Sequence, residues 1–125
     1  MKKVIVIDDE RLARVELKQL LKAFSSLEVV AEAANVAEGI KVIEQHQPDL
    51  IFLDIEMPEQ SGFDLLEEIE ETPQVIFTTA YSEYAIKAFE FNALDYLLKP
   101  IQEERLTKAI ERIFSLPKGS EESTS

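Results

Sequence analysis

The sequence predicts an α/β fold, a doubly wound three-layer sandwich in which helices cover both faces of a five-stranded parallel sheet. Short runs rich in β-branched residues alternate with segments whose apolar residues recur at helical spacing. Strict alternation of strand and helix is typical of right-handed crossovers between parallel strands. The five strand-like runs are residues 3–8, 28–34, 49–54, 74–79 and 95–98.

The apolar content of each run predicts its place in the sheet. The first, third and fourth runs are apolar almost throughout, as strands buried on both faces are, so we place them at the centre. The second run mixes Glu with apolar residues and the fifth is short, which favours the two edges. The predicted strand order is therefore 2-1-3-4-5, the order of a flavodoxin-like sheet.

Between the strands, apolar residues spaced three and four apart predict amphipathic helices. They form five groups: Leu12, Val15, Leu20, Leu21 and Phe24; Ile40, Val42 and Ile43; Leu65, Leu66 and Ile69; Ala85, Ala88 and Phe89; and Leu106, Ala109, Ile110 and Ile113. We interpret Phe89 and its aromatic neighbours Tyr84, Phe91 and Tyr96 as ordinary core residues. Exposure of some of them on an interaction surface is the alternative.

Length and composition define the class of protein. A chain of 125 residues is expected to form one domain with one core, over residues 1–116, followed by a flexible tail or truncated linker at 117–125. The formal net charge of -12 makes direct nucleic-acid binding by this domain unfavourable, and the absence of cysteine excludes disulfides and thiolate metal sites. Without a leader or a membrane-length apolar run, we expect a cytoplasmic protein with no membrane contact.

Polar residues end four of the five predicted strands, and ligands of such sheets bind outside the carboxyl ends of the strands. These residues are Asp8 and Asp9, Asp54, Thr79, and Lys99 with Pro100. Taken singly, Asp9 could be a helix N-cap, Asp54 could cap a loop, Thr79 could cap the next helix, and Lys99 could be a solvated side chain. Their joint position at one end of the sheet favours a functional site.

The chemistry of this set indicates phosphoryl transfer. Three carboxylates close together repel, so one takes up a proton unless a cation neutralises them. Mg²⁺ prefers oxygen ligands of this kind and completes its shell with phosphate oxygens. A carboxylate beside Mg²⁺, a lysine and a hydroxyl is equipped for in-line attack on phosphorus. Asp54 is the candidate nucleophile, and the product would be an aspartyl phosphate.

The sequence resembles the receiver domains of two-component response regulators. The matching segments are IDDE at 7–10, LDIEMP at 53–58 followed by Gly62, TTAY at 78–81 and YLLKP at 96–100. The resemblance covers residues 2 to about 115. The segment TTAYSEYAIKAFEFNALDYLLKPI is most similar to receivers of the LytTR (LytR/AlgR-type) subfamily, which carry LytTR-type DNA-binding domains. We expect Gly62 to ease the start of the following helix.

The resemblance implies a ligand set and a phosphoacceptor. It makes Asp54 the phosphoacceptor, with Mg²⁺ held by Asp8, Asp9, Asp54 and the backbone carbonyl of Glu56. Thr79 and Lys99 would bind the phosphoryl group.

It also implies a switch. Tyr96 matches the switch aromatic, and the Lys99–Pro100 peptide is expected to be cis. Glu56 and Tyr81 occupy positions that vary within the family, and we expect both to modulate the phosphoryl lifetime.

By the same resemblance, the function is phosphorylation-dependent signalling in transcription regulation. The implied partners are a sensor histidine kinase, the protein's own C-terminal output domain if the full-length protein has one, and a second copy through the fourth helix, fifth strand and fifth helix. Enzymatic activity is expected to be limited to self-phosphorylation from small phosphodonors and autodephosphorylation.

Two alternatives stay open. A Mg²⁺-dependent phosphohydrolase of the haloacid dehalogenase kind also uses an Asp nucleophile, but its motif has Asp two residues later, where this sequence has Glu56, and the chain has no cap domain. A stand-alone adaptor receiver that has lost phosphorylation would normally lack acidic or Lys residues, and all of them are present here.

Overall fold

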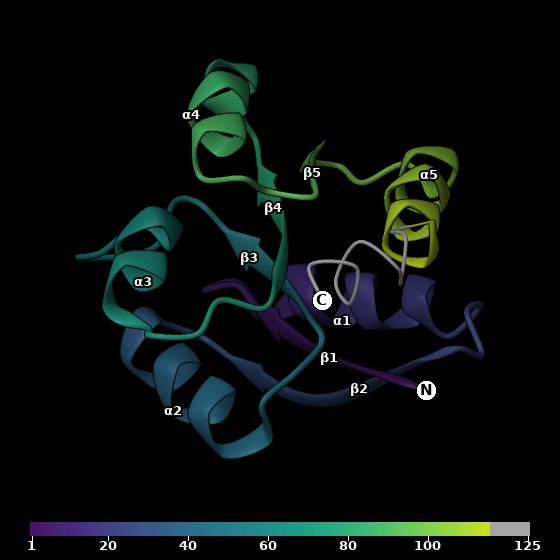
Figure 1. Cartoon of the computed structure of the whole chain (residues 1–125). Helices are drawn as coiled ribbons and strands as arrows, with labels where there is room; N and C mark the ends of the chain where they lie inside the picture. Colours follow the sequence, from purple (N-terminus) through teal and green to yellow (C-terminus); the bar gives the residue numbers. More distant parts are fainter. Residues whose placement is uncertain (116–125) are drawn as a thin grey trace, which may run out of the picture.

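A parallel sheet with the strand order β2-β1-β3-β4-β5 forms the centre of the computed structural model, which describes residues 1–115 (Figure 1). The strands are β1 (Lys2–Ile7), β2 (Leu27–Ala33), β3 (Leu50–Asp54), β4 (Gln74–Thr79) and β5 (Asp95–Leu98). All four pairings are parallel. The predicted fold class and strand order are confirmed, and each strand begins and ends within one residue of its prediction.

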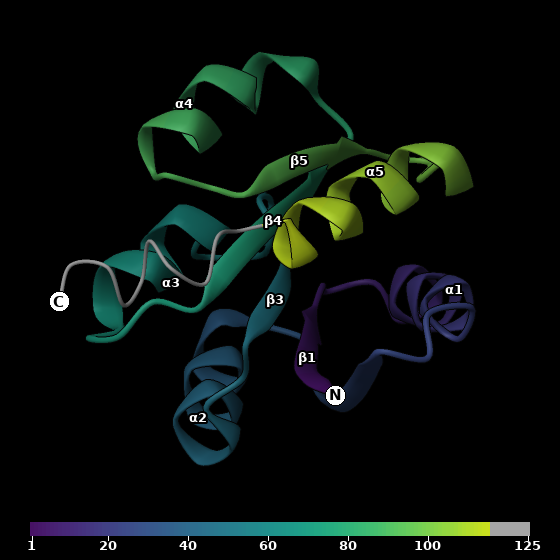
Figure 2. The same ribbon diagram turned by 45° about the vertical axis from the view of Figure 1, so that its right-hand side comes forward.

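Helices cover both faces of this sheet. They are α1 (Arg11–Leu21), α2 (Val36–His46), α3 (Gly62–Glu68), the 3-10 helix η1 (Ser82–Tyr84), α4 (Ala85–Glu90) and α5 (Glu103–Phe114). Figures 1 and 2 show α1 and α5 on one face and α2 and α3 on the other, with α4 beyond α3 near the β5 edge. No helix among residues 1–115 is long and apolar enough to cross a membrane.

The core consists of two hydrophobic layers, one on each face of the sheet. Side chains of a strand point alternately to its two faces, so neighbouring residues of the central strands enter different layers. The layer under α2 and α3 contains Ile5, Ile7, Ile51, Leu53, Val75 and Phe77. The layer under α1 and α5 contains Val4, Val6, Leu50, Phe52, Ile76 and Leu106. This two-sided burial fixes the register of the strands, because a slip of one residue would exchange the two layers.

Side-chain caps start two of the helices, but not the one beside the predicted site. The Asn35 side chain accepts the Glu38 N–H at the start of α2, and Ser61 forms a capping box with Asp64 at the start of α3. At α1 the N-cap residue is Glu10, with no side-chain cap bond. The alternative of Asp9 as an N-cap is therefore wrong, since Asp9 lies one residue before that position.

The interpretation of Phe89 as an ordinary core residue is wrong, because its side chain is 82% exposed. The short helix α4 buries Ala88 against the core, while Ile86 and Phe89 are exposed. Three other aromatic residues predicted with Phe89 pack partly buried against the α2 and α3 layer: Tyr84, Phe91 and Tyr96. The tail or linker predicted at 117–125 lies outside the described residues.

Candidate functional site

Three carboxylates meet at the carboxyl ends of β1 and β3. Asp54 is the last residue of β3, and Asp8 directly follows β1, whose Ile7 is in register with Leu53. One oxygen from each of Asp8, Asp9 and Asp54 lies within 4.8 Å of the other two. Asp8 and Asp54 are buried, whereas Asp9 is exposed to solvent. Such a group of oxygen donors, open on one side, is suited to a hard divalent cation.

Lys99 brings the positive charge of the site from the end of β5. Its Nζ lies 2.9 Å from Asp8 Oδ2, 3.4 Å from Asp54 Oδ1 and 4.0 Å from Glu10 Oε1. Its backbone N–H donates to the Thr79 carbonyl, and the Lys99–Pro100 peptide is cis. Burial alone would lower the pKa of Lys99, but its ion pairs with Asp8 and Asp54 outweigh burial and raise that pKa.

One ammonium does not balance three carboxylates. Burial, and then the negative charge of Asp8, raise the pKa of Asp54 to about 8, although Lys99 acts in the opposite direction. Without a cation, Asp54 is therefore largely protonated at neutral pH. This is the proton uptake expected for crowded carboxylates.

Gly62 begins α3 and is also required by space beneath the site. A Cβ at this position would lie 2.6 Å from the main-chain oxygen of Asp54 and 3.0 Å from Leu53 Cγ. The Gly62 N–H donates to the Ile55 carbonyl at 2.9 Å. Residue 62 is thus held against the backbone that carries Asp54, and any side chain would push the two apart.

The predicted switch residues lie around this cluster. Thr79 is buried at the end of β4, where its hydroxyl accepts the Tyr81 N–H at 3.0 Å. Tyr96 is half-buried on β5, in register with Phe77. Among residues 1–115, no hydrogen bond or ion pair links the side chain of Thr79 or Tyr96 to Asp54. The structure thus brings together the three carboxylates and Lys99, and leaves these two residues beside them.

The side chain of Glu56 is held by Tyr84, whose role at the site the sequence did not indicate. The Tyr84 hydroxyl donates to Glu56 Oε2 at 2.8 Å, and this bond raises the pKa of Tyr84. The ring of Tyr81, which is 47% exposed, meets the ring of Tyr84 edge-on with centroids 6.4 Å apart. Tyr84 therefore links the two positions expected to modulate phosphoryl lifetime. No spacing in the sequence indicates this contact, because its partners lie 28 residues apart.

This fold and site define a doubly wound α/β domain with a carboxylate cluster and a lysine at the carboxyl ends of its strands. The family model for the response regulator receiver domain matches residues 4–111. This chain belongs to that family, so it is a signalling domain of two-component systems.

Known relatives agree with this assignment. The chain is 48% identical over 115 residues to the transcriptional regulatory protein BtsR of Escherichia coli, covering 90% of this chain and 48% of BtsR. It is 46% identical over 112 residues to the sensory transduction protein LytT of Enterococcus faecalis, covering 87% of this chain and 46% of LytT. The similarity to LytTR-type receivers is confirmed, and the chain spans about half the length of these relatives.

A solved structure supports the fold independently. The response regulatory domain of protein mrkE from Klebsiella pneumoniae superposes with a TM-score of 0.80 at 35% identity. The match covers 90% of this chain and 95% of that one.

Proposed function

We propose that this domain accepts a phosphoryl group on Asp54 and thereby switches an output surface. The observation that carries the proposal is the position of Asp54, a buried carboxylate within reach of Asp8, Asp9 and the Lys99 amine. An Asp54 carboxylate oxygen attacks the phosphorus of the donor, and the bond to the leaving group breaks with its electron pair staying on that group. The proposed domain extends over residues 1–116.

The residues of the site fit a Mg²⁺ ion. Carboxylate oxygens of Asp8, Asp9 and Asp54 and the backbone carbonyl of Glu56 would hold it, and all are hard oxygen ligands. The raised pKa of Asp54 supports this fit, because it reflects positive charge that the site lacks. When bound, Mg²⁺ supplies charge neutralisation for the transferring phosphoryl oxygens. Lys99 would pair with the same oxygens and, together with the bound cation, favour the ionised form of Asp54 that attacks.

The switch in this proposal runs through the end of β4. A phosphoryl group adds negative charge and strong acceptor oxygens beside Thr79. The Thr79 hydroxyl would donate its proton to one of these oxygens, which draws in the backbone at Tyr81 through their existing hydrogen bond. Tyr96 would then occupy the space left in the adjoining core. Phosphorylation thus shifts a two-state equilibrium between arrangements of residues 79–96.

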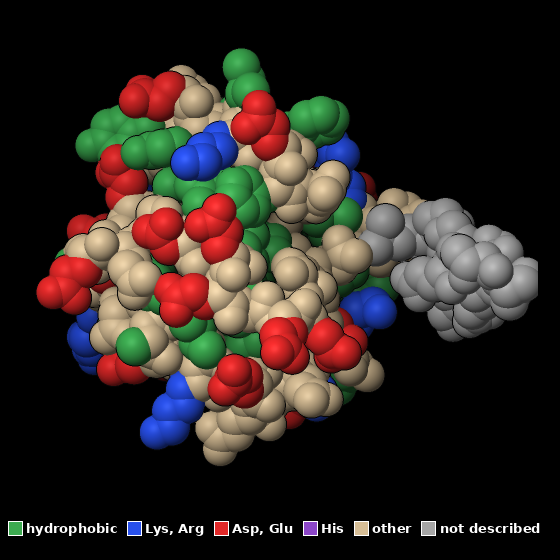
Figure 3. Space-filling view, turned by 60° about the vertical axis from the view of Figure 1, so that its left-hand side comes forward, with side chains coloured by type: hydrophobic (Ala, Val, Ile, Leu, Met, Phe, Trp, Pro, Cys, Tyr) green, Lys and Arg blue, Asp and Glu red, His purple; other side chains and the backbone are tan. Residues whose placement is uncertain are grey.

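The output surface that we propose is formed by α4, β5 and α5. Ile86 and Phe89 on α4 are 74% and 82% exposed, and Leu98 and Phe114 are each more than two-fifths exposed. Figure 3 shows hydrophobic side chains at the surface where α4 lies. Such residues favour a contact with a second copy, which would place two output domains together. By the resemblance to LytTR-type receivers, the output would be a LytTR-type DNA-binding domain. By analogy with the transcriptional regulatory protein BtsR, phosphorylation would control transcription.

The donor that we propose is a sensor histidine kinase in the cytoplasm. A groove of about 1050 Å³ runs between α1 and the segment that connects β5 with α5. It opens beside the site at Asp8 and Lys99, and its α1 wall carries the exposed Leu12 and Val15. An apolar helix surface of a kinase docked here would place its phosphohistidine next to Asp54.

Enzymatic activity in this proposal is limited to self-phosphorylation from small phosphodonors and autodephosphorylation. Glu56 and Tyr81 would set the phosphoryl lifetime, because Glu56 adds negative charge near the phosphoryl group and Tyr81 hinders the attacking water. We expect Glu56→Asn and Tyr81→Ala to change the dephosphorylation rate. Unchanged rates in both variants would contradict these two roles.

Intact mass after incubation with Mg²⁺ and acetyl phosphate tests the proposed phosphoacceptor. We expect the parent protein to gain one phosphoryl group and Asp54→Ala to gain none. Asp49→Asn is the matched control, because it alters an exposed Asp just before the opposite end of β3 and should gain one. A gain in Asp54→Ala would show that another residue is the acceptor. No gain in the parent would favour an adaptor that has lost phosphorylation.

A further inference from the structure

Arg14 on α1 connects the carboxylate cluster to strand β2. Its side chain is 15% exposed. One terminal nitrogen, Nη1, donates to the main-chain oxygen of Asp8 at 2.7 Å, and Nε donates to Glu32 Oε1 at 2.8 Å. A guanidinium is planar, so these two bonds fix the orientation of the whole group.

The bond from Arg14 completes the anchoring of the Asp8 peptide. The Asp8 N–H donates to the Ala33 carbonyl at 3.0 Å, and Asp8 Oδ1 accepts the Glu10 N–H at 2.9 Å. The main-chain oxygen that Arg14 holds belongs to the peptide unit between Asp8 and Asp9. Rotation of that unit would redirect Asp9, the exposed carboxylate of the cluster. The bond from Arg14 therefore fixes the direction in which the backbone presents the Asp9 side chain.

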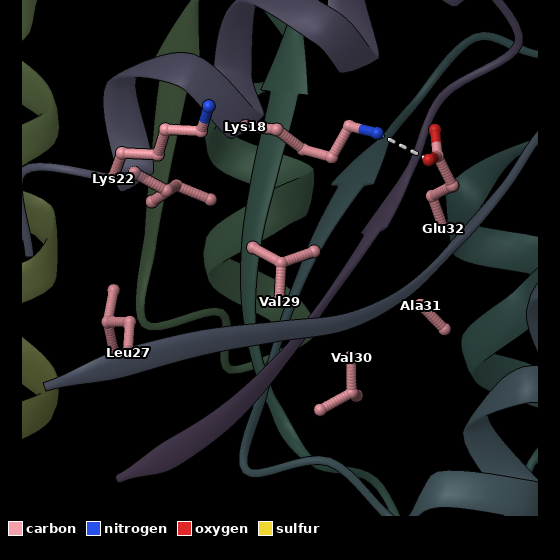
Figure 4. Close-up of a pocket in the computed structure, with 8 residues that line it drawn as sticks. Lys18, Lys22, Leu27, Val29, Val30, Ala31 and Glu32 are labelled. Carbon is pink, nitrogen blue, oxygen red and sulfur yellow. Dashed lines mark hydrogen bonds and ion pairs between the residues drawn. The ribbon is translucent and has the colours of Figure 1, made fainter. Parts of the chain in front are cut away.

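Glu32 holds the Arg14 side chain in place and also forms an ion pair with a second basic residue. Lys18 pairs with the other carboxylate oxygen of Glu32, beside a pocket of about 350 Å³ between α1 and β2 (Figure 4). The hydrogen bond from Lys18, and with it Arg14, lowers the pKa of Glu32, although partial burial acts in the opposite direction. Lys18 contacts Glu32 without contacting Asp8, so it shares the ion pair but not the site.

We propose that Arg14 is a positioning residue for the divalent cation, with Glu32 as its anchor. It holds the Asp8–Asp9 peptide in the orientation that aims both carboxylates at one point. Glu32 offsets only part of the positive charge of Arg14, because Lys18 shares the same carboxylate. The effect that we propose is orientation of the Asp8–Asp9 peptide, and the Arg14→Lys variant separates it from an effect of charge. This inference rests on the proposed function, because it concerns the same Mg²⁺ site.

A Mg²⁺ titration of the unphosphorylated protein, followed by backbone amide NMR shifts, tests this role. We expect Arg14→Met to weaken Mg²⁺ binding about tenfold, as for other groups that orient metal ligands, and Glu32→Gln to weaken it about threefold. Lys18→Met is the matched control, and its Mg²⁺ affinity should equal that of the parent. Arg14→Lys should remain weakened, because an ammonium lacks the planar fork that reaches both partners.

The same spectra show whether each variant is folded, and thermal unfolding without Mg²⁺ gives its stability. Equal Mg²⁺ affinity of Arg14→Met and the parent would overturn the inference. An equal loss in Lys18→Met, or full recovery in Arg14→Lys, would overturn it as well, since stability or charge alone would then explain the effect. A parent protein that binds no Mg²⁺ would overturn the proposed function itself.

Discussion

Two aspartates with largely buried side chains, at strand ends of the same sheet, have opposite electrostatic surroundings. The side chains of Asp54 on β3 and Asp95 on β5 are 4% and 8% exposed. The pKa of Asp54 is raised to about 8, whereas the pKa of Asp95 is lowered. Burial acts upward on both, so the difference comes from their neighbours.

The neighbours of Asp95 neutralise it completely. Arg105 on α5 binds both of its oxygens at 2.7 and 2.9 Å, and Arg112 adds an ion pair at 3.2 Å. The backbone N–H of Tyr96 also donates to it. Asp54 instead has one ammonium at 3.4 Å and two further carboxylates. Asp95 belongs to a structural ion-pair network whose carboxylate is already paired, while Asp54 belongs to a site whose carboxylates are balanced only with an added cation.

The largest effect is expected from removing the charge of Asp54. Its raised pKa means that the folded state holds a proton that the unfolded state loses above about pH 4. Stability without metal should therefore fall as pH rises from about 4 to about 8. Above that window, Asp54→Asn should be more stable than the parent by on the order of 5 kcal/mol, because each unit of pKa difference corresponds to about 1.4 kcal/mol. Near pH 4 the two should be equal.

Urea unfolding of both proteins across this pH range, in the presence of a chelator, measures this difference. A constant stability difference between parent and Asp54→Asn across the range would contradict the raised pKa.

The same substitution at Asp95 should have the opposite sign. Asp95→Asn leaves Arg105 and Arg112 without their shared carboxylate, and we expect a loss of about 2 kcal/mol at neutral pH. Because the pKa of Asp95 is lowered, its contribution is present at neutral pH and disappears as pH falls below about 4. A double-mutant cycle with Arg105→Gln in urea unfolding isolates the pair. A coupling energy near zero would show that Arg105 does not stabilise the Asp95 carboxylate.

Gly62→Ala tests the backbone that carries Asp54. The added Cβ would lie 2.6 Å from the Asp54 carbonyl, so the two segments must separate, at a cost of about 1 to 2 kcal/mol. Phosphorylation by acetyl phosphate should also slow, because Asp54 is displaced from its partners. Gly39→Ala is the control, since its added Cβ would meet side-chain carbons of Leu65 and Ile7 rather than the backbone that carries Asp54. Equal phosphorylation rates in the two variants would contradict this role.

The smallest effect is expected at Tyr84. Tyr84→Phe releases the Glu56 carboxylate, which can then turn toward the site and repel an anionic donor. We expect phosphorylation by acetyl phosphate to slow about twofold, comparable to the loss of one exposed hydrogen bond. Intact-mass time courses measure the rate, with Tyr81→Phe as a control. The slowing should vanish when Glu56 is changed to Gln, and its persistence there would disprove the explanation.

Most of the fold and the site centre could be predicted from the sequence. The apolar runs 3–8, 49–54 and 74–79 indicated central strands, and parallel strands bring Asp8 and Asp54 to one edge. The end of the fifth strand-like run, 95–98, then added Lys99. These features depend on local patterns and on one rule of topology.

The remaining features depend on packing between distant segments. Phe89 looked like core because helical spacing cannot tell which residues of a short helix face the sheet. Gly62 begins a helix, as its local sequence indicates, but the exclusion of any side chain at this position comes from the nearby carbonyl of Asp54. No pattern in the sequence indicates the role of Arg14, since its partner Glu32 lies 18 residues away. A pattern within a single helix or strand cannot indicate contacts with distant segments.

The most direct measurement of the central claim is a carbon-13 NMR titration of the Asp54 carboxyl, with and without Mg²⁺. An incomplete site predicts a midpoint near 8 without the ion, and a midpoint below its usual value near 4 with saturating Mg²⁺. The pKa of Asp95 in the same spectra should lie below the usual value of an aspartate in both conditions, because its arginine partners stay in place. A midpoint near 4 for Asp54 without Mg²⁺, or one that the ion leaves unchanged, would contradict the claim.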